Sequence, residues 1–301
     1  ALPSFPTPRS SHLGPLHVAL EEPIYFTLDL EGETIKGLHI SAGHVHRGME
    51  YLVMKRNFYQ NITLTERICS LCSNSHPTTF CMALEEIAGI DVPPRGHYLR
   101  VIADEIKRVA SNLFNVGIMA HIIGFTSLFM HVLETREIVQ DIKEPLYGNR
   151  MDLGANCIGG VKYNLNAESI AYLLKRLNEV APAVDEIHAI YSTHSCILTR
   201  TRGVGVLPNA IALEYGLIGP VARASGVEYD VRAKTPYAIY PELDFVIMNR
   251  PDGDVWSRAM VRLDEVKMAI VLICQCVAQL PEGPVAVTGL TIVPVGDEVA
   301  I

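Results

Sequence analysis

Two thiols and an imidazole lie close together in the sequence: Cys69 and Cys72 are separated by two residues, and His76 follows four residues later. Cysteines at this spacing can hold one thiophilic metal ion, because the short turn that carries them points both sulfurs the same way. The pair supplies only half of a tetrathiolate site. Three interpretations therefore stay open: a redox dithiol, half of a zinc or iron–sulfur site, and half of a nickel or nickel–iron site. Two buried structural cysteines would also fit this spacing.

The remaining cysteines and His76 give weaker signals. His76 lies one helical turn beyond Cys72, where it could ligate a metal or donate a hydrogen bond to the sulfur, although structural packing is the usual role of a single histidine. Cys274 and Cys276 lie two apart in an expected helix and point to different faces, so we predict that both are core residues. Three further cysteines have no partner spacing and are predicted to be buried small hydrophobic residues: Cys81, Cys157 and Cys196.

Acidic and histidine residues near the N-terminus complete the set of candidates. Glu22, next to Glu21, would be either half of an exposed acidic pair or, beside a metal thiolate, a proton relay. His46 and Glu50 lie between an expected hairpin and the first expected helix, and a solvated helix start explains Glu50 through the helix dipole. The sequence has no local serine–histidine–aspartate or paired-carboxylate signature, so it gives no support for hydrolysis.

Helical periodicity dominates the elements that must position these residues. Alternation of apolar and polar residues around a turn at 31–33 predicts a β-hairpin over 23–42. Helices are expected over residues 48–59, 72–88, 96 to beyond 131, 166–193 and 255–280. Alternation returns over 285–301, which suggests strands.

The fold class follows from this order of elements. We predict a mainly α (α+β) protein with a large helical bundle core and small antiparallel β elements at its N- and C-terminal ends. The expected organisation is a β-hairpin region over 1–45, a helical core over 46–280, and the start of a C-terminal β segment over 281–301. Because that apolar segment stops abruptly, we expect it to be cut short.

Composition excludes several classes of protein. The formal net charge of −8 and the lack of a basic block argue against nucleic-acid binding, which needs clustered Lys and Arg. Seven scattered cysteines, an odd number, do not form a secreted disulfide framework and favour a reducing compartment. Residues 113–133 carry no formal charge over a length that could span a membrane. Their polar members and charged flanks favour a helix wholly inside a large protein instead.

The residues around the two cysteines resemble a known family. Arg67 to Cys72, followed by His76, is similar to the RxCxxCxxxH motif of nickel–iron hydrogenase large subunits, and His46 to Glu50 resembles their RGxE element. Further segments, 14–23, 92–95, 224–232 and 280–284, resemble elements shared by membrane-bound, energy-converting hydrogenases and the large quinone-site subunit of respiratory complex I. The cysteine pair favours the hydrogenase side of this superfamily. The resemblance covers nearly the whole chain and implies the hydrogenase large-subunit fold.

The resemblance also implies roles for individual residues. Cys69 would be a terminal nickel ligand, and Cys72 would bridge nickel to an iron that bears carbonyl and cyanide ligands. His76 would hydrogen-bond the bridging sulfur, with Arg67 nearby, and Glu22 would be a catalytic proton relay. Glu50 would help to hold a structural Mg or Fe ion. The family's C-terminal DPCxxC motif and active-site arginine are absent from the 301 residues, so we expect a C-terminal segment to be missing from them.

The resemblance extends to activity and partners. It implies reversible reduction of protons to dihydrogen, coupled to ion translocation, with electrons from ferredoxin reaching the site through iron–sulfur clusters of a small subunit. Other hydrophilic and integral membrane subunits would hold the assembly at the cytoplasmic side of a prokaryotic cell membrane. Two alternatives stay open: a complex I-like quinone or acceptor module with His46 near the head group, and a scaffold subunit without a working metal site.

Overall fold

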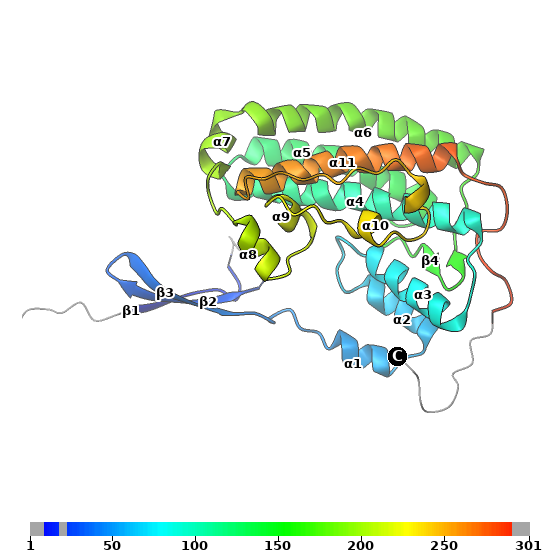
Figure 1. The fold of residues 1–301 in the computed structure, drawn as a ribbon, viewed down its shortest axis with the longest axis horizontal. Coiled ribbons are helices and arrows are strands. Elements are labelled where there is room, and N and C mark those ends of the chain that lie inside the picture. The colour runs from blue at the N-terminus through cyan, green and yellow to red at the C-terminus, as the bar shows by residue number, and fades with distance from the viewer. Residues whose placement is uncertain (1–8, 18–22, 291–301) are drawn as a thin grey trace, which may run out of the picture. The chain divides into compact units, whose positions relative to one another are not determined.

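The computed structural model describes residues 9–17 and 23–290, which fall into two compact units, residues 1–56 and residues 57–301 (Figure 1). The N-terminal unit contains an antiparallel sheet of order β1-β2-β3, formed by Arg9–Leu13, Tyr25–Glu31 and Thr34–Ser41, and the short helix α1, Met49–Met54. The predicted hairpin is confirmed as β2 and β3, and Gly32 adopts the positive φ of +64° that their tight turn requires. Strand β1 was not predicted, because its sequence shows no clear alternation.

Four long helices form the core of the second unit: α4, Pro94–Ile122; α5, Thr126–Tyr147; α6, Ala167–Thr193; and α11, Val255–Ala278. Helix α4 packs against α5 and α11, and α6 packs against the same two helices, which makes a bundle (Figure 1). The apolar face of α4 is almost completely buried, at Val101, Ile102, Ile106, Val109, Leu113 and Val116. The prediction of a mainly α protein with a helical bundle core is therefore confirmed.

Shorter elements surround this bundle. Helices α2, Phe58–Glu66, and α3, Ser75–Ala88, pack against each other, and both also contact strand β4, Asn156–Cys157, which pairs with β5, Gly160–Val161. The remaining elements are α7, Ser195–Thr201; α8, Asn209–Glu214; α9, Gly219–Arg223; α10, Val231–Lys234; and the 3-10 helix η1, Tyr240–Glu242. Ala286 forms a single antiparallel bridge with Gly160, and residues 291–301 of the expected C-terminal β segment lie outside the described residues.

The prediction of one helix from residue 96 past His131 is wrong. Helix α4 ends at Ile122 and α5 begins at Thr126, with Gly124 between them at a φ of +81°. The left-handed glycine and the hydrogen bond from Phe125 N to Ala120 O (2.8 Å) close the helix end, so that the chain turns back onto α4. This turn is exposed, with Ile122 at 60% relative exposure, so residues 113–133 are not wholly inside the protein. Within the described part of the chain, no helix has the length and hydropathy needed to cross a membrane.

The predictions for the isolated cysteines hold only in part. Cys81 and Cys276 are fully buried, as expected. Cys274, however, is exposed. It lies two residues before Cys276 on α11, and residues two apart in a helix point to different faces, so Cys274 is on the outward face. Cys157 and Cys196 are only partly buried. Of the predicted core thiols, two therefore belong to the core.

Candidate metal centre

The CxxC sequence lies in an irregular segment between the end of α2 at Glu66 and the start of α3 at Ser75. We call residues 67–74 the cysteine loop. A backbone hydrogen bond from Ser75 N to Cys72 O (3.1 Å) closes its last turn and leads directly into α3. The predicted start of this helix at residue 72 is therefore three residues early, because the second cysteine still belongs to the loop.

The structure brings the two thiols and the imidazole together. A hydrogen bond joins the thiols of Cys69 and Cys72, both partly buried, and His76 Nε2 lies 3.5 Å from Cys72 Sγ. Burial, with a smaller contribution from Cys69, raises the pKa of Cys72 to about 11, while burial lowers the pKa of His76. In the absence of metal the site therefore holds a protonated Cys72 thiol and a neutral imidazole at pH 7. The Cys72 thiol must lose its proton when a metal binds its sulfur.

A polar cluster under the cysteine loop fixes where α3 begins. Asp104 of α4 accepts hydrogen bonds from Asn74 Nδ2 (2.6 Å) and Thr78 Oγ1 (3.1 Å). Asn156 Nδ2 of β4 in turn donates to Asn74 Oδ1 and Thr78 Oγ1, both at 3.1 Å. All four side chains are buried, and burial raises the pKa of Asp104 to about 6. The cluster therefore ties the end of the cysteine loop to the central helix.

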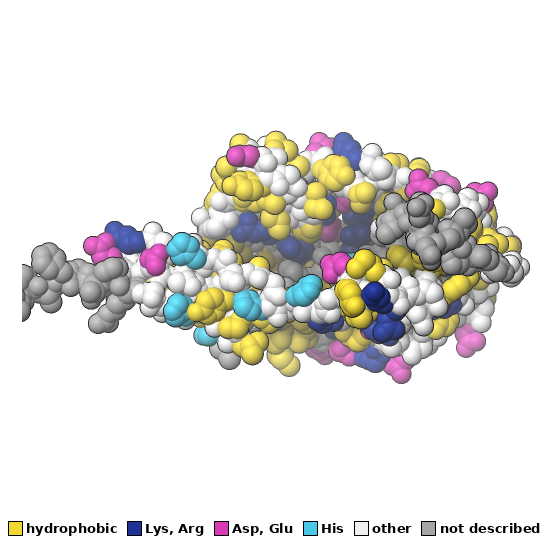
Figure 2. Space-filling model, turned by 90° about the horizontal axis from the view of Figure 1, so that it is seen from below, with side chains coloured by type: hydrophobic (Ala, Val, Ile, Leu, Met, Phe, Trp, Pro, Cys, Tyr) yellow, Lys and Arg dark blue, Asp and Glu magenta, His cyan; other side chains and the backbone are white. Residues whose placement is uncertain are grey.

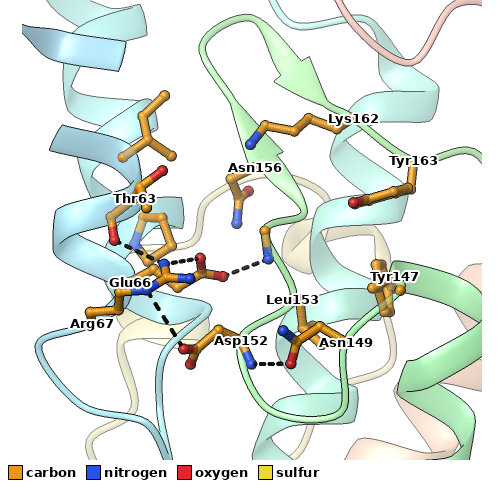
Figure 3. Close-up of a pocket in the computed structure, with 14 residues that line it drawn as sticks. Thr63, Glu66, Arg67, Tyr147, Asn149, Asp152, Leu153, Asn156, Lys162 and Tyr163 are labelled. Atoms are coloured by element: carbon orange, nitrogen blue, oxygen red, sulfur yellow. Dashed lines mark hydrogen bonds and ion pairs between the residues drawn. The ribbon is translucent and has the colours of Figure 1, made fainter. Parts of the chain in front are cut away.

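A pocket of about 270 Å³ lies beside the cysteine loop, between α2 and the segment 147–163 (Figure 3). Arg67 lines it and donates through Nη1 to Glu66 Oε2 and to Thr63 O, both at 3.1 Å. Its Nε lies 4.0 Å from Asp152 Oδ2, and Glu66 Oε1 accepts from Gly154 N (2.6 Å). Arg67 thus joins α2 to the opposite wall of the pocket. Sequence reasoning found Arg67 through its motif and missed Asp152, which carries no local signal.

The predicted site residues near the N-terminus lie either outside the described residues or in the N-terminal unit, which is described separately from the unit that carries the cysteine loop. Glu22 lies outside the described residues. His46 and Glu50 belong to the N-terminal unit, where both are exposed, and Glu50 lies in the first turn of α1 as expected. Figure 2 shows histidine side chains gathered along that unit, and the exposed histidines there include His12, His39 and His44.

The residues present fit half of a nickel–iron centre. Cys69 and Cys72 offer two adjacent soft sulfurs, the ligands that nickel and iron favour, and His76 can bond one of them. Within residues 9–17 and 23–290, no group of three or more His, Cys, Asp or Glu side chains is arranged to hold a metal ion.

Comparison with known proteins agrees with this site. The family described as nickel-dependent hydrogenase matches residues 47–115, which include the cysteine loop, and the family described as the 49 Kd subunit of respiratory-chain NADH dehydrogenase matches residues 123–299. The chain is 58% identical over 289 residues to the carbon monoxide-induced hydrogenase of Rhodospirillum rubrum, across 96% of this chain and 80% of that protein. The chain belongs to the hydrogenase large-subunit family.

Two other relatives are subunits of a hydrogenase and of a dehydrogenase. It is 36% identical over 279 residues to the membrane-bound hydrogenase subunit alpha of Pyrococcus furiosus, across 90% of this chain and 65% of that protein. It is 33% identical over 274 residues to a subunit of the F(420)H(2) dehydrogenase of Methanosarcina mazei, across 91% of this chain and 73% of that protein. The predicted resemblance is therefore confirmed, and this hydrogenase subunit is an oxidoreductase related to complex I.

Proposed function

We propose that this chain is the catalytic large subunit of a membrane-associated nickel–iron hydrogenase that reversibly reduces protons to dihydrogen. The observation that carries the proposal is the contact between the Cys69 and Cys72 thiols with His76 3.5 Å from the second sulfur. The 58% identity to a carbon monoxide-induced hydrogenase supports the same assignment. Neither a buried structural pair nor a redox dithiol accounts for both observations together.

Cys69 and Cys72 would hold the nickel–iron centre through their sulfurs. When bound, the centre supplies the electron chemistry of dihydrogen formation. His76 would orient the Cys72 sulfur, and the ion pairs of Arg67 would keep α2 and the wall at Asp152 in place. Cys69 would release and accept a proton at its sulfur, and Glu22 would carry that proton away from the site.

The proposal includes a path for the electrons and a set of partner subunits. Those residues hold no cysteine cluster for an iron–sulfur group, so electrons would arrive through clusters of a small iron–sulfur subunit, with ferredoxin as the donor. The relative named membrane-bound hydrogenase subunit alpha supports membership of a larger assembly. We place that assembly at the cytoplasmic side of the membrane, with integral subunits that translocate ions. Glu50 would help to hold a structural Mg or Fe ion.

A complex I-like acceptor module is the second candidate function. The match of residues 123–299 to the 49 Kd subunit family and the identity to the F(420)H(2) dehydrogenase relative favour it. In that case His46 would lie near a quinone head group and the cysteine pair would carry no metal. Nickel content separates the two candidates directly.

The test is a pair of matched cysteine substitutions in the intact complex. Cys72→Ser removes one of the two proposed ligand sulfurs, whereas Cys274→Ser changes an exposed thiol of α11. We expect Cys72→Ser to lower both nickel content and hydrogen evolution at least about tenfold, and Cys274→Ser to leave both unchanged. Equal nickel and equal hydrogen evolution in the two variants would refute the assignment. A complex without nickel that still reduces a quinone would establish the second candidate.

A further inference from the structure

One face of the central helix α4 carries a row of buried polar side chains. Arg100, Asp104 and Lys107 are spaced four and three residues apart, so they lie along one stripe of the helix. Arg100 binds Glu85 of α3 and the carbonyl oxygens of the 157–160 turn, and Asp104 binds the start of α3. The third member of the row, Lys107, reaches the cysteine loop itself.

Lys107 lies behind the main chain that joins the two cysteines. Its side chain is 3% exposed, and its Nζ donates hydrogen bonds to Ser70 O (3.1 Å) and Met151 O (2.6 Å). Ser70 lies between Cys69 and Cys72, so one of these bonds holds the middle of the CxxC sequence. Ser73 Oγ also donates to Met151 O (3.5 Å), so this carbonyl, which immediately precedes the pocket-lining residue Asp152, accepts hydrogen bonds from both Lys107 and the cysteine loop.

Burying an ammonium group costs desolvation free energy, which hydrogen bonds or opposite charges must offset. Burial lowers the pKa of Lys107 and the nearby charge of Arg136 adds to this, whereas the charges of Asp152 and Glu66 oppose it. Two carbonyl oxygens also accept hydrogen bonds from its ammonium group. Lys143 of α5 gives the contrast. It is fully buried, its Nζ has no hydrogen-bond partner among the described residues, and burial lowers its pKa to about 6. Of these two buried amines, Lys107 is the one whose surroundings support a positive charge next to the cysteine loop.

We propose that Lys107 is a positioning residue of the metal centre: its ammonium ties the main chain between Cys69 and Cys72 to Met151 and holds a fixed positive charge behind the two sulfurs. A positive charge at this place favours anionic sulfur ligands and favours the reduced state of a metal bound to them. The inference rests on the proposed function, because it concerns the centre that the two cysteines would hold.

The test compares three substitutions in the intact complex. Lys107→Gln keeps a hydrogen-bond donor without the charge, Lys107→Met removes both, and Lys143→Met removes the other buried amine without touching the cysteine loop. We measure nickel content, hydrogen evolution and the midpoint potential of the nickel signal in a redox titration followed by electron paramagnetic resonance. Both Lys107 variants should evolve hydrogen at least about tenfold more slowly and show a midpoint potential shifted to more negative values. Lys143→Met should match the wild type in all three measurements.

The outcomes separate this inference from the proposed function. If the wild-type complex contains no nickel, the proposed function itself fails. Suppose that the wild type and Lys143→Met contain nickel and that Lys107→Gln matches their midpoint potential and activity. Lys107 then has no positioning role, even if the melting temperature of the Lys107→Gln complex is lower. Loss of nickel from a folded Lys107→Gln complex supports the role, because the loop then no longer presents its sulfurs correctly. Should Lys107→Met fail to fold, Lys107→Gln decides, and partial recovery in Lys107→Arg would show that charge is the essential property.

Discussion

The ion pair between Glu85 and Arg100 is the most deeply buried link between α3 and the central helix. Arg100 Nη1 donates to Glu85 Oε2 (2.7 Å) and Nη2 to Glu85 Oε1 (2.5 Å), with both side chains almost fully buried. Arg100 Nη2 also donates to Cys157 O and Gly160 O, each at 3.0 Å, and Gly159 N donates to Glu85 Oε1 (2.6 Å). The pair therefore holds the helix that follows the cysteine loop against the 157–160 turn.

Neutralising Glu85 should therefore strongly lower the free energy of unfolding. Glu85→Gln keeps the shape of the side chain but leaves the Arg100 guanidinium buried without its ion-pair partner, and breaking a buried pair in this way costs about 3–5 kcal/mol. The free energy of unfolding of a domain is typically about 5–15 kcal/mol, so the variant would lose a large part of its stability. Asp185→Asn is the matched control, because Asp185 pairs with Lys267 (2.6 Å) on the surface, where such pairs contribute about 0–1 kcal/mol.

A double-mutant cycle measured by urea unfolding provides the assay. Glu85→Gln, Arg100→Met and the double variant should give a coupling energy above about 1 kcal/mol, because Arg100→Met removes the unpaired charge that makes the first substitution costly. If the two effects add within about 0.5 kcal/mol, or if Glu85→Gln costs no more than Asp185→Asn, the pair does not hold α3 as described.

Three further predictions follow from single residues. Lys143 has a pKa of about 6 in the fold against an ordinary 10.5, so the unfolded chain binds the extra proton between these values and stability should rise with pH by up to about 1.4 kcal/mol per unit. Urea unfolding of Lys143→Met from pH 7 to 9 should lose this slope, and an unchanged slope would contradict the neutral buried amine. A Cβ at Gly160 would overlap Val285 O, so Gly160→Ala should cost about 1–3 kcal/mol in thermal unfolding, whereas an unchanged melting temperature would mean that this contact does not exist. His76→Ala should lower nickel content or hydrogen evolution about 10–100-fold in the intact complex, and full activity would remove His76 from the site.

The parts of the site that sequence could predict are those with a local signal. Cys69, Cys72 and His76 lie in one short segment, so their spacing in the sequence is enough to bring their side chains together in the structure. The expected helix starting near residue 166 is confirmed as α6, because Asn166 caps it by accepting from Ser169 N (2.8 Å). The last predicted helix is confirmed as α11 for similar reasons.

The supporting residues could not be predicted because their partners are distant in the chain. Lys107 reaches Ser70 and Met151, 37 and 44 residues away, and no short pattern predicts such contacts. In the sequence the charges of α4 form a flank of the uncharged stretch 113–133, and the structure buries two of them, Asp104 and Lys107. Charged residues spaced along one face of a long, otherwise buried helix are the signal that could have indicated a buried polar cluster. The break at Gly124 was missed because glycine within a periodic pattern does not by itself end a helix.

The central claim is that Cys69 and Cys72 are ligands of a nickel-containing centre, and X-ray absorption at the nickel edge of the intact complex tests it most directly. The account predicts a sulfur coordination shell in the wild type and in Cys274→Ser. In Cys72→Ser we expect most of the nickel to be lost, and any nickel that remains to have one sulfur fewer in its shell. A nickel shell of nitrogen and oxygen alone, or a sulfur shell that Cys72→Ser leaves unchanged, would contradict the claim.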